Sequence, residues 1–143
     1  LTRVAPRLRL GSDIEFLNRP EWRSVAAAYG LRFAETHSYN PTFMYRAVAD
    51  GTVDVISAFS SDGRIAALDL VTLADPRHAL PSYDAVILIS PTRAHDAGFV
   101  AALRPLIGVI SIERMRQANL MVDRDQNKRT PREAADWLLG GKR

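Results

Sequence analysis

The hydrophobic and polar positions of the first half of the chain change period at Gly, Pro and Asn residues. Residues 7–10 alternate polar and apolar positions and stop at Gly11, which predicts a short strand ending in a turn. Apolar residues then recur at helical spacing between Pro20 and Gly30. Proline suits the first position of a helix and glycine suits the residue after its end. The chain is therefore predicted to open with a strand followed by a helix.

The same order continues along the sequence. Residues 31–36 alternate as a strand, and a second helix is predicted between Asn40, as its N-cap, and Gly51. Residues 53–59 are rich in β-branched side chains and form the next predicted strand. The Ser, Asp and Gly of residues 60–63 predict a turn whose glycine has a positive φ.

The second half of the chain changes from strands to helices. Residues 68–73 and 85–89 are two further predicted strands, and the second is apolar without alternation, as in a strand covered on both faces. Only helices are predicted after it, at residues 99–106, 111–121 and 130–139, the last opening with a capping box. This pattern predicts one α/β lobe followed by a helical segment.

Length and composition limit the class of protein. The 143 residues, 47% of them hydrophobic, are enough for one ordinary core, so one compact domain is expected. The apolar runs are about 5 residues long, whereas a membrane-spanning helix needs about 20. The chain shows neither an initiating Met nor a signal-like start. We therefore expect either a removed signal or a piece of a longer protein, and favour the second.

Charge and metal-ligand patterns exclude further classes. The 19 basic and 16 acidic residues are interleaved, and no aromatic residues alternate with the basic runs, so nucleic acid is not an expected partner. Cysteine is absent, which removes disulfides, thiolate catalysis and cysteine-ligated metals. His37, His78 and His95 share no metal-ligand spacing, and no glycine-rich phosphate loop occurs. We expect no metal and no cofactor.

Candidate polar chemistry gathers after the first predicted strand. Open α/β sheets place ligands at the carboxyl ends of their strands, where Asp13 and Glu15 lie. These carboxylates suit either an acid and base pair or local helix capping. Arg19 directly precedes the helix that Pro20 begins, so its guanidinium suits either a carboxylate ligand or a surface ion pair.

Two aromatic residues lie at predicted strand ends. Phe59 follows one strand and Tyr83 precedes another, and such rings either belong to the core or wall a site that attracts a quaternary ammonium group. Ser60 lacks the glycines of a nucleophile elbow, so turn formation explains it more simply. A small α/β hydrolase or transferase using Asp13, Glu15 or Ser60 stays open as an alternative.

Several ordered motifs occur together between residues 11 and 140. The most specific is DGTVDVISAFSSDGRIAALDLVTLAD, residues 50–75. The others are EFLNRP (15–20), AAYGLRF (27–33), PSYDAVIL (81–88), LRPLIGVISIERMRQANLMVD (103–123) and TPREAADWLL (130–139). Together they resemble the substrate-binding proteins of osmoprotectant ABC importers, which capture glycine betaine, choline, carnitine and related compounds. In that family the first motif reads G-x-V-D-V-x-x-A-Y-S-T-D-G-R-I, followed by D-L-x-x-L-x-D.

This resemblance implies an α/β fold, the three-layer lobe of a type II periplasmic binding protein with C-terminal helices. Residues 1–10 would enter from the first lobe, residues 11–83 would form the second lobe, and residues 84–143 would be a hinge strand and a helical return to the first lobe. The implied role is ligand binding without catalysis. An effector-sensing domain of a LysR-type transcription regulator shares the two-lobed architecture and is the alternative.

The resemblance also implies a binding site. Arg19 resembles the family's carboxylate-binding Arg, Tyr83 matches a cage Tyr, and Phe59 stands where the family commonly has another cage Tyr. Asp13 is the fourth predicted ligand-binding residue. The family's Asp-Gly after the Arg is replaced here by Glu21 and Trp22.

The implied partners are a small quaternary-ammonium ligand and an ABC permease in the membrane. The implied location is the periplasm or the extracellular face of the cytoplasmic membrane. Part of the family's first lobe has no counterpart in this sequence. We therefore expect a homodimer or an exchange of elements between chains, because surface that lacks its intramolecular partner favours association.

Overall fold

The structure, a computed structural model, describes residues 1–140, and the chain divides into two compact units. The first unit contains residues 1–59 and 71–82. The second contains residues 60–70 and the chain from residue 83 onward. Each unit is therefore built from two separate stretches of sequence.

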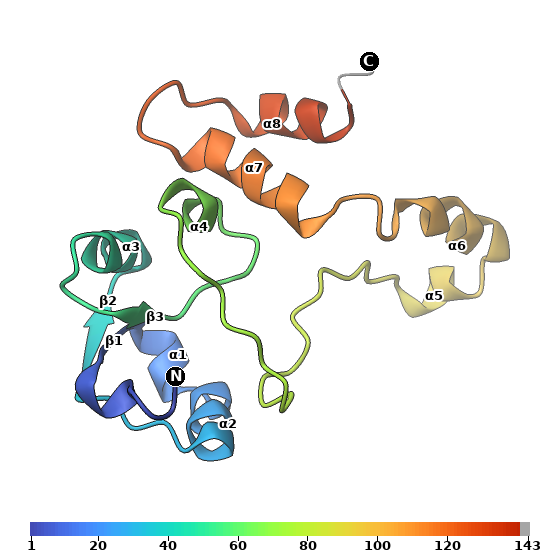
Figure 1. The fold of residues 1–143 in the computed structure, drawn as a ribbon. Coiled ribbons are helices and arrows are strands. Elements are labelled where there is room, and N and C mark those ends of the chain that lie inside the picture. The colour runs from blue at the N-terminus through green and yellow to red at the C-terminus, as the bar shows by residue number, and fades with distance from the viewer. Residues whose placement is uncertain (141–143) are drawn as a thin grey trace. The chain divides into compact units, whose positions relative to one another are not determined.

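A three-stranded parallel sheet forms the centre of the first unit, in the order β2-β1-β3 (Figure 1). In chain order the elements of the first unit are η1 (Ala5–Arg7), β1 (Arg9–Asp13), α1 (Ile14–Asn18), α2 (Pro20–Tyr29), β2 (Glu35–Tyr39), α3 (Pro41–Ala49) and β3 (Val55–Ile56). The connection from β1 to β2 and the connection from β2 to β3 cross the sheet in opposite directions. Because such connections are right-handed, α1 and α2 lie on one face and α3 lies on the other.

The two helices that the sequence predicts in the first unit, α2 and α3, are present with the predicted start and end signals, whereas α1 was not predicted. Pro20 is the first residue of α2, and Gly30 ends that helix with a φ of 62°. The side chain of Asn40 accepts a hydrogen bond from the Thr42 N–H (3.1 Å) at the start of α3, and Gly51 follows this helix with a φ of 74°. Both predicted helices are confirmed.

The first predicted strand was placed too early. β1 runs through Gly11 to Asp13, so the prediction that Gly11 ends this strand is wrong. A Cβ atom at Gly11 would lie 3.0 Å from the side chain of Val53 and 3.2 Å from the ring of Tyr39. This glycine therefore gives room to neighbours inside the sheet.

The second predicted strand, residues 31–36, is displaced in the same direction, because β2 begins at Glu35. The Leu31 N–H donates to the Ala26 carbonyl (2.9 Å), so Leu31 still belongs to the end of α2. The ring of Phe33 lies 6.2 Å from that of Trp22. The apolar residues before β2 therefore serve packing against α2 and not a strand.

The third predicted strand, residues 53–59, is shortened to Val55–Ile56. Val53 is 1% exposed and belongs to the core between the sheet and α3. The other buried apolar residues of the first unit are Ala5, Leu10, Met44, Tyr45 and Ala47. These residues lie in η1, β1 and α3, so these three elements contribute most of the core of the first unit.

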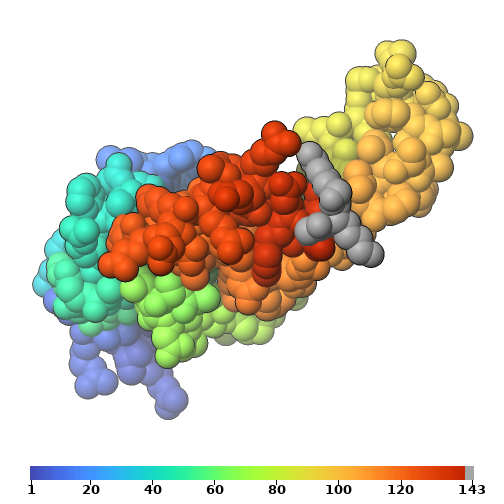
Figure 2. All heavy atoms as spheres, turned by 90° about the horizontal axis from the view of Figure 1, so that it is seen from above, coloured from blue at the N-terminus to red at the C-terminus, as the bar shows by residue number. Residues whose placement is uncertain are grey.

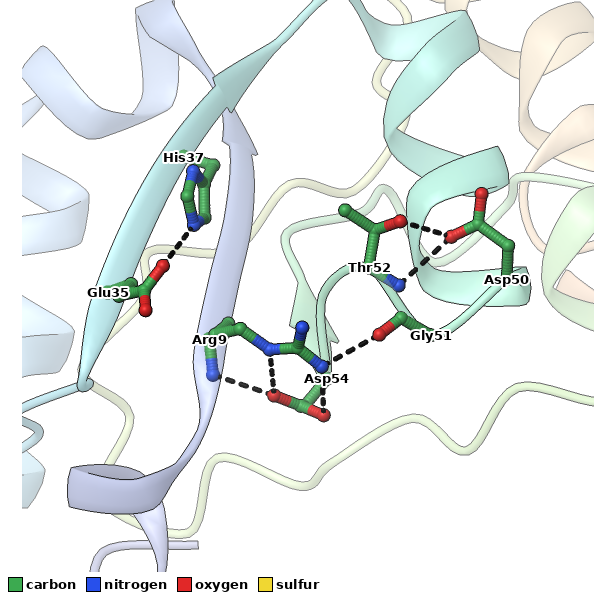
Figure 3. Close-up of polar contacts among 7 residues, drawn as sticks. All are labelled: Arg9, Glu35, His37, Asp50, Gly51, Thr52 and Asp54. Atoms are coloured by element: carbon green, nitrogen blue, oxygen red, sulfur yellow. Dashed lines mark hydrogen bonds and ion pairs between the residues drawn. The ribbon is translucent and has the colours of Figure 1, made fainter.

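An ion pair joins β1 to the chain that enters β3 (Figure 3). The backbone N–H of Arg9 donates to Asp54 Oδ2 (2.8 Å), and its guanidinium donates to both Asp54 oxygens and to the Gly51 carbonyl (2.7 Å). Hydrogen bonding from Arg9 lowers the pKa of Asp54. This cluster fixes the amino-terminal end of the sheet, where β1 and β3 begin.

The described part of the second unit contains helices joined by irregular segments and has no strand. Its elements are α4 (Arg64–Ala67), α5 (Pro91–Ala94), α6 (Ala97–Leu103), η2 (Arg104–Leu106), α7 (Ile112–Asp123) and α8 (Pro131–Leu138). α7 and α8 pack side by side, as their orange and red atoms show (Figure 2). The predicted helix at residues 99–106 changes to 3-10 helix at Arg104, one residue before Pro105. The predicted capping box of α8 is confirmed.

The turn at residues 60–63 packs against α7. Asn119 donates to the Ser61 carbonyl (2.8 Å), and the guanidinium of Arg116 donates to the Ser60 carbonyl. The predicted positive φ of Gly63 is wrong, since its φ is −66°. A Cβ atom there would lie 2.6 Å from Leu120 Cα, so this position requires glycine for space.

The two remaining strand predictions, residues 68–73 and 85–89, are wrong. Neither segment contains a strand, and the second is exposed instead of buried, with Val86 72% and Leu88 90% accessible. A strand forms only when a second backbone satisfies its N–H and C=O groups. Within residues 1–140 these segments lie outside the sheet, which contains β1, β2 and β3 alone.

Candidate functional site

The carboxyl ends of the three parallel strands lie along one edge of the sheet in the first unit. Asp13 ends β1 in register with Tyr39 at the end of β2, and Ser57 follows β3 directly. In open parallel sheets this edge is the one that binds ligands. It is therefore the candidate site.

Asp13 is positioned by two elements at once. It is the last residue of β1 and the N-cap of α1, where its Oδ1 accepts a hydrogen bond from the Phe16 N–H (2.8 Å). The capping role that the sequence allowed is therefore present. Glu15, the other carboxylate of the suggested acid and base pair, binds Arg19 instead, so the two carboxylates have separate partners.

Arg19 is the single residue between α1 and α2. Its backbone is extended, and its guanidinium donates to the carboxylate of Glu15 one turn earlier. The Arg19 side chain keeps 41% of its surface accessible. An arginine has five N–H donors, so one guanidinium can bind more than one acceptor.

Two serine hydroxyl groups lie close to this edge of the sheet. Ser12 is fully buried in β1, and its hydroxyl lies 2.6 Å from that of Ser57. The Ser57 hydroxyl also donates to the sulfur of Met44 on α3 (3.8 Å). These bonds satisfy the buried hydroxyl of Ser12 and join β1 to the residue that follows β3.

The two predicted aromatic residues are placed in different units. Phe59 lies three residues after β3, at the end of the first unit's first stretch, and is 69% exposed. Tyr83 begins the long stretch of the second unit and is 53% exposed. The reading of either ring as core is thus wrong. Asp13, Arg19 and Phe59 share one unit, and Tyr83 does not belong to it.

Sequence analysis missed Tyr39, which lies at the same edge. The residue is half-buried in register with Asp13, and its ring lies against the backbone of Gly11. It was overlooked because the strand was predicted to end at residue 36. The signal was nevertheless present, since Asn40 and Pro41 start a helix and the preceding strand has to end just before them.

Among residues 1–140, no group of three or more His, Asp or Glu side chains is arranged to hold a metal ion. A hollow of about 430 Å³ is lined by Arg114, Gln117, Trp137 and Gly140, away from all predicted site residues in sequence. The helices within the described part of the chain are all too short or too polar to span a bilayer.

Known proteins resemble this chain over nearly its whole length. Residues 1–139 match the family described as the substrate-binding domain of the ABC-type glycine betaine transport system. The carnitine transport binding protein OpuCC of Listeria monocytogenes is 27% identical over 127 residues, which cover 86% of this chain and 41% of OpuCC. The ergothioneine transport permease and binding protein EgtU of Helicobacter pylori is 26% identical over 80 residues, 55% of this chain and 14% of EgtU.

A solved structure extends this similarity to the fold. The crystal structure of a glycine betaine/carnitine/choline ABC transporter matches with a TM-score of 0.79 at 27% identity, over 99% of this chain and 52% of that one. The match confirms the predicted α/β periplasmic-binding-protein fold. The chain spans about half the length, or less, of these relatives.

The family assignment decides among the protein classes that the sequence left open, namely an enzyme, a transcription regulator and an importer domain. Its members bind substrates for transport and do not transform them, so the expectation of a non-catalytic domain is confirmed and the hydrolase or transferase alternative is excluded. The match along residues 1–139 also favours an importer domain over a transcription regulator. The chain belongs to the family of substrate-binding domains of ABC-type glycine betaine transport systems.

Proposed function

We propose that this chain forms part of the receptor domain of an ABC importer, which captures quaternary-ammonium osmoprotectants such as glycine betaine, carnitine or choline. The family match over residues 1–139 is the observation that carries this proposal. The names of the relatives support it, because carnitine, glycine betaine and choline appear in them. In this role the domain acts in the periplasm or on the extracellular face of the cytoplasmic membrane and delivers its ligand to a permease.

The proposal assigns the parts of the chain to lobes. Residues 1–10 enter from the first lobe, residues 11–83 form the second lobe, and residues 84–143 return to the first. The coverage of only 52% of the matched structure supports this assignment, because the chain then represents part of a two-lobed molecule.

Ligand binding is proposed to use π faces for the cation and Arg19 for the carboxylate. A trimethylammonium group has no N–H to donate, so aromatic faces are its best partners, and Phe59 and Tyr83 supply exposed rings. Phe59 lacks the hydroxyl of the family's usual Tyr and keeps the π face. Asp13 and Tyr39 are further proposed binding residues, at the sheet edge of the first unit. A ligand carboxylate would share the Arg19 guanidinium with Glu15.

The exposed apolar segments of the second unit suggest an additional partner. Val86, Leu88, Ile107 and Val109 are each at least 60% accessible. Exposed apolar side chains favour association. We propose that the 143-residue chain by itself forms a homodimer or exchanges elements between copies.

Calorimetric titration tests the receptor function. Glycine betaine, carnitine and choline are titrated into the natural full-length gene product and into its Arg19→Ala variant. The matched control is Arg23→Ala, an exposed arginine one turn further along α2 that is not among the predicted site residues. Loss of a charge-assisted hydrogen bond should weaken the two carboxylate ligands roughly 10- to 100-fold in Arg19→Ala and leave the control unchanged.

The outcomes separate the parts of the proposal. Binding of the betaines that is lost with Arg19 supports both the receptor and the carboxylate clamp. Choline binding that is indifferent to Arg19, with no betaine binding, keeps the receptor and removes the clamp. Absence of binding for all three ligands contradicts the receptor function for this ligand class.

A further inference from the structure

A hydrogen-bonded loop fastens residues 75–80 to the end of α2 within the first unit. The hydroxyl of Tyr29, the last residue of α2, donates to Asp75 Oδ1. The second oxygen of Asp75, Oδ2, accepts the Leu80 N–H (2.8 Å). One carboxylate therefore joins a helix end to two points of the loop. We call Tyr29, Asp75, Arg77 and Leu80 the Asp75 latch.

Arg77 strengthens the latch by three contacts with the end of α2. Its backbone N–H donates to the Tyr29 hydroxyl oxygen (2.9 Å), and its guanidinium carbon lies 5.4 Å from the centre of the ring. The guanidinium also donates to the Ala28 carbonyl in the last turn of α2. A cation at the carboxyl end of a helix is favoured by the helix dipole.

The backbone of the loop adopts an uncommon conformation at one residue, His78. His78 has a φ of 49°, a left-handed conformation that is uncommon for residues other than glycine. Its N–H donates to the Asp75 carbonyl (3.1 Å). Such a conformation persists where surrounding bonds determine it, and here those bonds converge on Asp75.

The latch lies close in sequence to a proposed binding residue. Leu80 precedes Tyr83 by three residues, which span at most about 10 Å of extended chain. We propose that Tyr29 and Asp75 are positioning residues for Tyr83, fixing the chain that carries its ring. This inference rests on the proposed function and deepens it, since neither residue is assigned to contact the ligand.

The test removes the latch without touching the proposed site. Tyr29→Phe deletes the hydroxyl and keeps the ring under Arg77, and Asp75→Ala deletes the shared acceptor. Asp54→Ala is the matched control, because it removes an aspartate of the same unit that binds Arg9 and has no bond to the latch residues. Glycine betaine affinity, melting temperature and amide hydrogen exchange of residues 76–83 are measured for the full-length protein and each variant.

The expected result separates positioning from stability. Both latch variants should bind glycine betaine about tenfold more weakly, since misplaced binding groups lose affinity, whereas Asp54→Ala should lower the melting temperature with affinity kept within about twofold. Exchange of residues 76–83 should rise in the latch variants only. In a Tyr83→Ala background, Tyr29→Phe should cause no further loss, because its effect acts through Tyr83.

Two results would overturn the inference, and they are distinguishable. If the unaltered protein binds glycine betaine and folded Tyr29→Phe and Asp75→Ala bind it equally well, the positioning role is refuted and the receptor function stands. If the unaltered protein binds none of the osmoprotectants, both the receptor function and the positioning role fail. Hydrogen exchange, which needs no ligand, would still show whether the latch anchors the loop.

Discussion

At the scale of single residues, the folded chain uses several carboxylates as hydrogen-bond acceptors. The guanidinium of Arg9 lowers the pKa of Asp54, and the hydroxyl of Tyr29 lowers the pKa of Asp75. The backbone N–H of Thr130 lowers the pKa of Glu133. In each case the folded protein favours the ionised carboxylate over its protonated form.

These depressed pKa values predict that stability declines in acid. The stabilisation is complete above the pKa of an unfolded carboxyl group, about 4, and is lost as the pH falls through the lower pKa of the folded state. The melting temperature should therefore be level near pH 7 and fall below about pH 4. Asp54→Asn should lower it at neutral pH and make its acid dependence shallower. An equally steep decline in this variant would contradict the role of Asp54.

Gly63 is predicted to tolerate no side chain. Because a Cβ atom would meet the backbone of α7, Gly63→Ala should destabilise the protein by about 1–3 kcal/mol, as overpacking does. Gly98→Ala is the control, since Gly98 lies in α6 with its nearest contact at 3.6 Å and alanine favours helix. Urea unfolding measures both variants. If Gly63→Ala and the unaltered protein were equally stable, α7 would have shifted to make room for the added methyl group.

At the scale of elements, the start of α8 offers a direct test of capping. Thr130 Oγ1 accepts the Glu133 N–H (3.2 Å), and Glu133 Oε2 accepts the Thr130 N–H (2.7 Å). Thr130→Ala removes one half of this exchange and should cost about 1 kcal/mol in urea unfolding. Thr130→Ser keeps the hydroxyl and should retain most of the stability. Equal losses in the two variants would rule out the cap as the cause.

Helices were predictable from the sequence because their signals are local. Pro20 with Gly30, and Asn40 with Gly51, mark the ends of α2 and α3 through bonds within a few residues. Strands depend on partners far along the chain. Gly11 was read as an end because its neighbours, Val53 and Tyr39, are distant in sequence.

The apolar run at residues 85–89 shows the same limit more strongly. Its composition suits a buried strand, yet Leu88 is 90% exposed in the structure. Apolar composition reports what a segment is able to bury, and the available backbone partners decide whether it pairs. Packing explains residues 31–36 in the same way, because the ring of Phe33 lies beside that of Trp22 on α2.

At the scale of the whole molecule, the candidate site was predictable in part. The rule that ligands bind at the carboxyl edge of a parallel sheet led to Asp13 and, with the helix start, to Arg19. Phe59 and Tyr83 came from the family resemblance. Tyr39 required the register of β2, and the pairing of Arg19 with Glu15 required coordinates. The use of all these residues in binding stays a prediction.

Self-association of the 143-residue chain is also predicted at this scale. Light scattering across a concentration series should show a mass above that of the monomer, because Val86 and Leu88 expose apolar surface. Val86→Lys with Leu88→Lys should reduce the association. Val71→Lys is the control, because Val71 is 85% exposed and lies outside these segments. A monomeric mass at high concentration would contradict the prediction.

The interleaving of the two units has a consequence for synthesis on the ribosome. The first unit needs residues 71–82, which emerge only after residues 60–70 of the second unit have been made. Asp75 follows Ile56, the last residue of the sheet, by 19 residues, a delay of about 1 to 4 seconds at ordinary translation rates. The sheet and α2 are thus complete on the nascent chain before the Asp75 carboxylate is available to bind Tyr29 at the end of α2. During that interval a chaperone or a protease meets the first unit with its latch open.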